Sequence, residues 1–414
     1  MKTIQKIQSF FKTETVLCIS GAAALLTMFF VPPSKDYLSY LDLRVLSLLF
    51  CLMAVIAGFN ETGVFLSISE KLLKRVKNTR ALSFVLIMLC FFTSMLITND
   101  VALITFVPFG IMILSITGQT KYFIRVIVLQ TIAANLGSML TPVGNPQNLF
   151  LYSKYDISFQ EFLKITYPYT LVSFVLLCIV IFLIKKEPLS FELPVKEKTD
   201  RKKSYSTFIY SILFVVCLLC VLRLIDDWIT LLIVLLTILI FNYKLLKKVD
   251  YSLLLTFVFF FLFVGNIGNI TVVKEYLAEL IGNKELPVSI AASQIISNVP
   301  AAVLLSAFTD NYKTLIIGTD IGGLGTLIAS LASLISYKFY CKTEASRPGT
   351  FLKTFTIYNI IFLIGLCLFY EFGLHVIWPF LLWLIMKQLF GMQFKSISIP
   401  FLIKKTVQTD EEGS

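Results

Sequence analysis

Apolar runs long enough to cross a lipid bilayer recur along the whole chain. Clear examples cover residues 16–32, 43–59, 169–184 and 251–268. A spanning helix needs about 17–25 predominantly apolar residues, and it satisfies its own backbone hydrogen bonds in lipid. Only 15% of the 414 residues are charged, whereas a soluble domain usually carries about 25%. The sequence therefore predicts an all-α integral membrane protein whose main surroundings are the lipid bilayer.

About ten spanning helices are expected, together with two segments of a different kind. The spans are predicted at residues 16–32, 43–59, 126–152, 165–184, 207–223, 228–243, 251–268, 313–341, 353–372 and 375–394. Segment 287–308 has two arms of about ten residues around a polar tip, which is too short to span twice and predicts a re-entrant hairpin. Segment 81–117 has longer arms, so a hairpin and two spans both remain open. Internal symmetry favours the hairpin.

The basic residues predict how the chain is oriented. Lys and Arg number 36 and Asp and Glu 25, an excess that would suggest nucleic-acid binding in a soluble protein. Here the positive charges lie in loops between apolar segments, so no nucleic-acid partner is expected. With the N-terminus in the cytoplasm, 27 Lys and Arg fall inside and 8 outside. This positive-inside bias predicts cytoplasmic N- and C-termini, in a plasma membrane of the bacterial type.

The two halves of the chain resemble each other in the order of their segments. The predicted organisation is a tail with a first scaffold helix at 1–42, a repeat at 43–184, a cytoplasmic linker with two scaffold helices at 185–250, a second repeat at 251–372, and a last helix with the C-terminal tail at 373–414. An odd number of spans in the first repeat makes the second start on the opposite side. Inverted-topology repeats with broken helices in matching places indicate a transport site near the middle of the membrane.

Both repeats contain a polar hairpin tip and a helix broken by glycine. The residues selected for substrate or ion binding are Thr98, Asn99 and Asp100 at the first tip, Ser297 and Asn298 at the second, Asn135, Gly137, Thr141, Gly144, Asn145 and Pro146 at the first break, and Asp320, Gly322 and Thr326 at the second. A helix that stops near Gly137 and restarts near Pro146, with Asn145 as its cap, explains the glycines and prolines. The free N–H groups of a restarted half-helix suit the oxygens of an anion.

Two carboxylates in these segments are candidates for ion coupling. Asp100 follows the first tip and Asp320 lies at the second break, and ionisable residues deep in a membrane are usually functional. Each is expected to bind a proton or Na⁺, or else only to cap a nearby half-helix. No Lys or Arg occurs at either break or tip, so the sequence does not predict a pocket for a polyanion.

These motifs resemble the ion transporter superfamily, which includes arsenite permeases, a class of Na⁺/H⁺ antiporters, citrate-type permeases and divalent-anion:sodium symporters. The matching runs are 97–103, the Asn135-Leu136-Gly137 and Gly144-Asn145-Pro146-Gln147-Asn148 stretches, and Gly318–Gly323. The resemblance implies a scaffold and a transport domain, opposed hairpins, an elevator motion and often a homodimer. It also implies a sodium site at Thr98, Asn99, Ser297 and Asn298. Asp100 and Val299 replace the symporters' Thr at the third position of each tip.

The leading hypothesis is an ion-coupled permease for a small anion or oxyanion-like solute, with Na⁺ or H⁺ as the coupling ion and no other cofactor. The alternative is a Na⁺/H⁺ antiporter, which buried Asp residues without a buried cation would suit. An enzyme is disfavoured because the H-E-x-x-H and G-x-S-x-G motifs are absent. The Cys217/Cys220 pair has no second pair of ligands and lies within a predicted span, so neither a metal site nor redox chemistry is expected there. A receptor or channel fits the broken repeats less well than a transporter does.

Overall fold

The computed structural model describes residues 14–73, 76–189, 201–282, 284–344 and 346–377. The chain divides into a unit of residues 1–366 and a second unit of residues 367–414. In the described part of the second unit, the end of α19 (Pro348–Leu368) continues into a π-helical segment, Phe369–Ile377. The predicted last span at 375–394 lies almost wholly outside the described residues, as do both tails and most of the linker.

Helices make up the regular structure of the described residues in the first unit, apart from one isolated bridge between Asn78 and Pro188. Among the described residues, seven helices are long and apolar enough to cross a membrane, at Leu43–Thr62, Asn99–Ile116, Phe159–Phe182, Lys203–Val221, Asp227–Lys248, Tyr251–Gly268 and Pro348–Gly373. The all-α membrane class predicted from the sequence is confirmed. Six of the seven coincide with predicted spans, and the seventh is the second arm of segment 81–117. The first predicted span is a shorter apolar helix, α2 (Thr15–Met28).

Segment 81–117 folds as α6 (Thr79–Thr93) and α7 (Asn99–Ile116) around a short polar tip. The two ends of this segment lie close together, because Thr79 bonds to the chain at Lys185 and Glu187, and Lys121 pairs with Glu187. Its tip instead contacts the break of the next helix, as described below. The chain therefore enters and leaves at one end and turns at the break, a course that a hairpin and two spans share, so the hairpin stays a prediction.

The second hairpin is shorter, with arms α15 (Glu285–Ile296) and α16 (Asn298–Leu305). The turn between them is a single residue, Ser297, with φ 74° and ψ 154°. A non-glycine residue rarely adopts positive φ, and such strain tends to persist where the surrounding structure fixes it. Each hairpin is followed by a helix that packs on its first arm: α8 (Phe123–Ser138) on α6, and α17 (Tyr312–Gly322) on α15.

Both predicted broken helices are broken where the sequence indicated. The first stops at Ser138 and resumes as α9 (Pro146–Lys154), and the second stops at Gly322 and resumes as α18 (Leu331–Cys341). Pro146 occupies the first position of α9, where its missing N–H costs nothing. Non-helical backbone at membrane depth is tolerated when it is buried in protein, and both breaks are largely buried.

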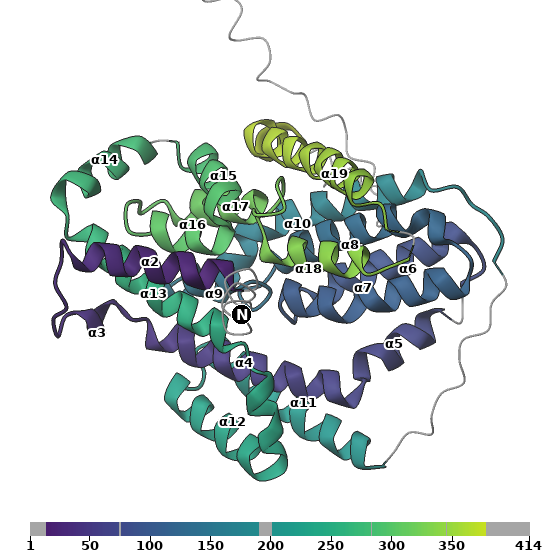
Figure 1. Ribbon diagram of the computed structural model, residues 1–414, viewed down its shortest axis with the longest axis horizontal. Coiled ribbons are helices and arrows are strands. Elements are labelled where there is room, and N and C mark those ends of the chain that lie inside the picture. Colours follow the sequence, from purple (N-terminus) through teal and green to yellow (C-terminus); the bar gives the residue numbers. More distant parts are fainter. Residues whose placement is uncertain (1–13, 74–75, 190–200, 283, 345, 378–414) are drawn as a thin grey trace, which may run out of the picture. The chain divides into compact units, whose positions relative to one another are not determined.

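Other helices flank these elements (Figure 1). A helix pair lies along one edge, where α2 packs on α13 (Tyr251–Gly268). Elsewhere α4 (Leu43–Thr62) packs on α11 (Arg201–Val221) and α12 (Asp227–Asn242). The remaining elements are α3 (Tyr37–Tyr40), α5 (Val64–Leu73), α10 (Phe159–Phe182), α14 (Thr271–Ile281), and the 3₁₀ segments Thr120–Tyr122 and Tyr243–Lys248.

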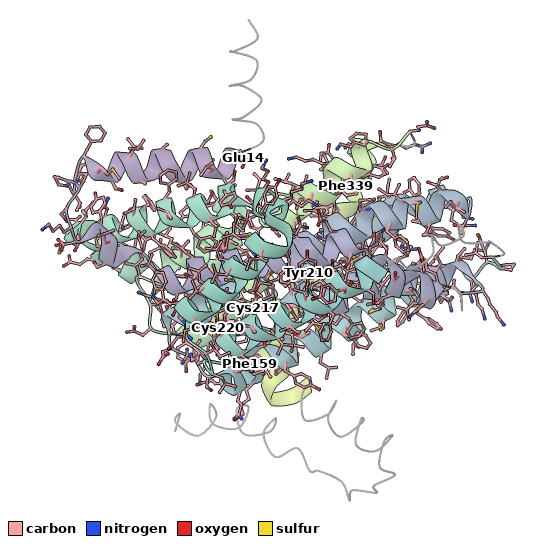
Figure 2. All side chains as sticks on the ribbon, turned by 90° about the horizontal axis from the view of Figure 1, so that it is seen from below. Glu14, Phe159, Tyr210, Cys217, Cys220 and Phe339 are labelled. Carbon is pink, nitrogen blue, oxygen red and sulfur yellow. The ribbon has the colours of Figure 1, made fainter. Side chains whose placement is uncertain are left out.

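The sequence's C-x-x-C pair lies on α11, which packs on α4. Cys217 and Cys220 follow Tyr210 along α11, and both cysteines are buried free thiols (Figure 2). A Cβ added at Gly58 of α4 would lie 2.8 Å from the Tyr210 ring. Glycine at that position lets the two helices approach closely, as small residues often do in membrane proteins.

Charged loop residues pair with other residues that were assigned to the same side of the membrane. Lys121, Lys185 and Glu187, all from predicted cytoplasmic loops, meet at one place. Lys248, also predicted inside, pairs with Glu61 at the end of α4. Residues of predicted outer loops meet elsewhere, with Arg223 pairing with Asp156. The loops therefore sort into two sets as the positive-inside bias predicted, although which set faces the cytoplasm stays a prediction.

Candidate functional site

Each hairpin tip is attached to the break in its own repeat by the same backbone hydrogen bond. The N–H of Asn99 donates to the carbonyl of Gly144 at 3.1 Å, and the N–H of Asn298 donates to the carbonyl of Ala329 at 3.0 Å. Gly144 and Ala329 each directly precede the residue that begins a half-helix. The tips therefore lie where the two broken helices restart.

Two glycines allow each broken helix to approach its hairpin closely. A Cβ at Gly137 would lie 2.1 Å from the carbonyl oxygen of Phe91, and one at Gly322 would lie 2.6 Å from Oγ of Ser293. Real Cβ atoms do not come so close to other atoms, so neither position can hold a larger residue without movement of its neighbours. These are the glycines that the sequence placed at matching points of the two repeats.

A threonine in each break is tied to its hairpin, Thr141 to the turn just after α6 and Thr326 to the end of α15. The hydroxyl of Thr141 donates to the carbonyl of Met95, and the hydroxyl of Thr326 donates to the carbonyl of Gln294. The Gln294 side chain adds further support, since it donates to the carbonyls of Gly322 and Leu324 at 2.9 Å each and accepts from the Thr326 N–H. Both selected threonines therefore fix the shape of the breaks.

The two repeats also contact each other reciprocally. Asn135 at the end of α8 accepts from the hydroxyl of Ser330 at the start of α18, at 3.1 Å. Asp320 near the end of α17 accepts from the amide of Asn145 at the start of α9, at 3.5 Å. Asn135 matches Asp320 and Asn145 matches Ser330 between the repeats. Each helix end thus meets the half-helix start of the other repeat, the pattern that a twofold axis between the repeats requires.

The helices follow the same reciprocal pattern. Helix α7 of the first hairpin packs on α18 of the second repeat, and α16 of the second hairpin packs on α9 of the first. The first tip joins the reciprocal contacts directly, because Nδ2 of Asn99 donates to Oδ1 of Asn135 at 2.9 Å. We call Asn99, Asn135, Asn145, Asp320 and Ser330 the central network. All five residues are buried.

The starts of the two half-helices differ in their electrostatic surroundings. Neither N-cap side chain, Asn145 of α9 or Ser330 of α18, bonds to its own helix, so Asn145 does not act as the side-chain cap that was predicted. Its amide donates to Asp320 instead. The positive end of α9 therefore already faces a carboxylate of the protein, whereas the start of α18 faces the neutral Asn135.

The other selected residues border this network without joining it as closely. Thr98 is the N-cap residue of α7, but its side chain makes no capping bond. The Ser297 hydroxyl lies 3.4 Å from Oδ1 of Asn298 and from the carbonyl of Ala329. The described residues thus place Thr98 and Ser297 at their respective tips, and the sodium site predicted there stays a prediction.

Asp100 lies in the first turn of α7, beside the tip, and is half-buried. Its own N–H donates to Oδ1 of Asn99, but within the described part of the chain its carboxylate has no hydrogen bond and no ion pair. The charged group that interacts electrostatically with Asp100 is another carboxylate, Asp250, which repels it. Asp250 itself caps α13 by accepting a hydrogen bond from the N–H of Leu253. Asp100 is therefore free to bind a cation, and it does not serve as a side-chain cap for another helix.

Four polar residues that were not selected as site residues from the sequence complete the site: Gln147, Asn148, Gln294 and Ser330. Gln147 and Asn148 belong to the family-like stretch at the first break and Ser330 to the second break, whereas Gln294 was not singled out. Nε2 of Gln147 lies 3.4 Å from Oδ1 of Asp320, and Nδ2 of Asn148 lies 3.3 Å from its Oδ2. Both amides are buried on a short half-helix. Their presence in an apolar context was the available signal, but their partner is more than 170 positions away along the chain.

Comparison with known proteins gives the family. The citrate transporter family matches residues 10–314. An uncharacterized transporter of Methanocaldococcus jannaschii is 35% identical over 354 residues, which cover 85% of this chain and 95% of the relative. An inner membrane protein of Escherichia coli is 28% identical over 320 residues, covering 75% of this chain and 83% of the relative.

A shorter similarity reaches a transporter with a known cargo. A silicon efflux transporter of Oryza sativa is 31% identical over 142 residues, covering 34% of this chain and 29% of the relative. Because this match covers only part of both proteins, it adds to the family assignment and says little of the cargo.

Proposed function

The chain belongs to the citrate transporter family, within a superfamily of permeases that includes the arsenite permeases, and we propose that it moves a small anion or oxyanion-like solute by ion-coupled secondary transport. Its membership makes it an integral membrane transporter and not an enzyme. The observation that carries the proposal about cargo is the start of α18, where a half-helix begins against neutral polar groups at the centre of the two repeats.

Three features support an anion at this position. The first N–H groups of a helix lack partners within the helix and carry partial positive charge. The Ser330 side chain leaves those of α18 uncapped, and Oγ of Ser333 in its first turn is buried with no hydrogen-bond partner. The Asn99 and Asn135 amides lie beside Ser330. Both amides are neutral, and no Lys or Arg of the described residues bonds to them. Such surroundings suit a solute of low charge.

Coupling to a cation gradient is supported by Asp100 and Asp320. A carboxylate taken out of water needs a compensating charge or a proton. Within the described residues, no Lys or Arg pairs with either one. Na⁺ or H⁺ from solution would neutralise them, and the release of that ion would change the state of the site.

The arrangement of helices supports an elevator motion. The hairpins and broken helices form one connected group through the reciprocal contacts, while α4 packs mainly on α11 and α12. In this proposal the first group moves as a body against the flanking helices, and a homodimer would hold the flanking helices still. The inner-membrane relative of Escherichia coli supports a bacterial plasma membrane. The excess of Lys and Arg in the loops assigned to the inside supports termini on the cytoplasmic side.

A binding screen tests the proposed class of cargo. The purified protein is heated in detergent with a panel of small carboxylates and oxyanions, and the unfolding midpoint is compared with that in chloride. At least one anion should raise the midpoint, because a ligand that binds only the folded state stabilises it. The rise should be lost in Asn135→Ala. A panel in which no anion raises the midpoint would contradict the proposal.

A Na⁺/H⁺ antiporter is the second candidate, favoured by the two carboxylates and the lack of a basic residue in the described site. It predicts a different result in vesicles that contain no anion other than chloride. Addition of Na⁺ would then collapse a preformed proton gradient, whereas an anion permease requires its solute before it dissipates the gradient.

A further inference from the structure

Asp320 is surrounded by amide groups that hold it only loosely. The residue as a whole is only 2% exposed. The amide nitrogens of Asn145, Gln147 and Asn148 lie 3.5, 3.4 and 3.3 Å from its oxygens. Hydrogen bonds to a carboxylate are usually shorter than 3 Å. Three long bonds from neutral groups compensate poorly for the loss of water around a buried charge.

A second electronegative oxygen converges on the same place. Nδ2 of Asn148 lies 3.3 Å from Oδ2 of Asp320 and 3.5 Å from the carbonyl oxygen of Met139. Met139 is the C-cap residue of α8, where the last carbonyls of a helix lack partners and carry partial negative charge. One NH₂ group thus lies between a carboxylate and a helix-end carbonyl.

Two of the amides also have an unused oxygen. Oδ1 of Asn145 and Oδ1 of Asn148 are buried and have no hydrogen-bond partner in the part of the chain that the structure describes. Leaving such an oxygen unpaired costs about 1–3 kcal/mol. A half-turn of the Asn148 amide would exchange its nitrogen and oxygen and bring Oδ1 toward Asp320 and the Met139 carbonyl. That arrangement is repulsive alone and becomes favourable around a cation.

No charged group among the described residues supplies that cation. Helix α17 packs on α8, α9, α10, α15 and α16. The charged residues of these helices and of α17 itself, all near helix ends, are Arg125, Lys154, Glu161, Lys164, Glu285 and Lys313. Arg125 bonds to Tyr358, Glu161 pairs with Lys313, and Glu285 accepts from Thr309. None of the six is a partner of Asp320.

We propose that the Asp320 carboxylate, the Met139 carbonyl and the amide oxygens of Asn145 and Asn148 form a Na⁺ site. The inference deepens the proposed function, on which it rests, by naming the coupling ion and its ligands. Helix-end and unwound carbonyls coordinate Na⁺ in other transporters with broken helices. A single carboxylate balances one monovalent charge, whereas a divalent ion would leave a buried excess of positive charge.

The matching place in the other repeat lacks this chemistry. Asn135 takes the position of Asp320, Ser330 that of Asn145, and Ser333 that of Asn148. None of these three residues is a carboxylate, so the two pseudo-equivalent positions have different functions in this proposal. The end of α8 with Asp320 takes the cation, and the start of α18 with Asn135 takes the anion. This site also differs from the one expected at the hairpin tips.

The test measures Na⁺ binding to the full-length protein in detergent, without any transported solute. The unfolding midpoint is followed as NaCl replaces choline chloride at constant ionic strength, with KCl as a second series. Wild type should show a saturable rise with Na⁺ that K⁺ does not reproduce. The rise should be lost in Asp320→Asn and Asn148→Leu and kept in Ser336→Ala, a matched change at a buried, unpartnered hydroxyl on α18.

A gain of function keeps the test decisive if Asn148→Leu does not fold. Asn148→Asp adds a second carboxylate at the same place, so stabilisation by Ca²⁺ should appear that wild type lacks. A Na⁺ rise that persists in Asp320→Asn, or the absence of any rise in wild type, overturns the site. If Na⁺ does not raise the midpoint but a proton gradient drives accumulation of an anion, the Na⁺ site is wrong and the proposed function still holds. The two failures are therefore distinguishable.

Discussion

Asn99 and Asn298 hold equivalent places in the two hairpins, where each N–H bonds to the carbonyl that precedes a half-helix. We expect Asn99→Ala and Asn298→Ala each to weaken transport, because each removes a buried side-chain amide from the site. Loss of such a group leaves its partners unpaired at a cost of about 1–3 kcal/mol, which corresponds to a loss of roughly 5- to 150-fold in affinity for the solute. The backbone bonds that fix the tips remain, so the yield of folded protein should change little. Solute exchange in proteoliposomes measures the effect.

A buried amide outside the site serves as the control for these two variants. Asn359 is fully buried in α19, where its Nδ2 donates to the carbonyl of Phe355. Asn359→Ala should lower stability to a similar degree but leave the affinity for the solute unchanged. Wild-type exchange in both tip variants would contradict their place in the site.

Asp100 tests whether a carboxylate at the tip contributes to coupling. Asp100→Asn keeps the size and the hydrogen-bonding capacity of the side chain but removes its charge. We expect gradient-driven accumulation to fall while exchange of solute across the membrane persists, since exchange requires no net movement of the coupling ion. Near-normal accumulation with unchanged dependence on pH and Na⁺ would exclude a coupling role for Asp100.

Individual residues differ in how far the sequence could identify them. Gly137, Gly322, Thr141 and Thr326 were found because a break and its glycines recur in both halves, and local contacts explain them. Asn148 was noted in the family-like stretch but not selected as a site residue, because its role depends on Asp320, which only the folded chain brings near. Asn145 was expected to cap its own helix through its side-chain oxygen, but its Nδ2 faces Asp320 and its Oδ1 has no hydrogen-bond partner among the described residues.

At the scale of elements, the close approach of each broken helix to its hairpin predicts how the glycines respond to substitution. Gly137→Ala places a methyl group against a backbone carbonyl that cannot rotate away, whereas Gly322→Ala meets the Ser293 side chain. We expect both to destabilise the protein by about 1–3 kcal/mol or more, with Gly137→Ala the greater. Thermal unfolding in detergent measures the difference.

Gly349 provides the control for that series. A Cβ there would meet nothing within 4 Å, and it lies in the first turn of α19. Gly349→Ala should therefore be neutral or slightly stabilising. Equal midpoints for Gly137→Ala and Gly349→Ala would show that α8 and the first hairpin do not pack as described.

The sequence anticipated the elements better than their contacts. Both breaks and both hairpins follow from glycine, proline and polar residues in apolar runs, whose physical meaning is local. The length of α7 did not decide between a hairpin and two spans, because an apolar helix of 18 residues suits either. The contacts of Thr79 and Lys121 with the chain near Glu187 bring the two ends of the segment together, as either course would, and they join positions far apart in sequence.

At the scale of the whole molecule, the two sets of charged loops predict accessibility to reagents that do not cross membranes. In a cysteine-free background, Lys186→Cys should resist labelling in intact cells and Lys154→Cys should react, since both side chains are exposed but belong to opposite sets. Labelling of both after permeabilisation confirms that each is reachable. The reverse pattern in intact cells would invert the orientation.

The central claim is that this chain moves a small anion by coupling it to a cation gradient. It is tested most directly by the accumulation of a labelled anion, chosen from the binding screen, in proteoliposomes under an imposed inward Na⁺ gradient. Wild type should concentrate the anion above its external level, and the accumulation should collapse when Na⁺ is equal on both sides or when Asp320 is replaced by Asn. Equilibration of the anion without accumulation under Na⁺ and H⁺ gradients alike would contradict the claim.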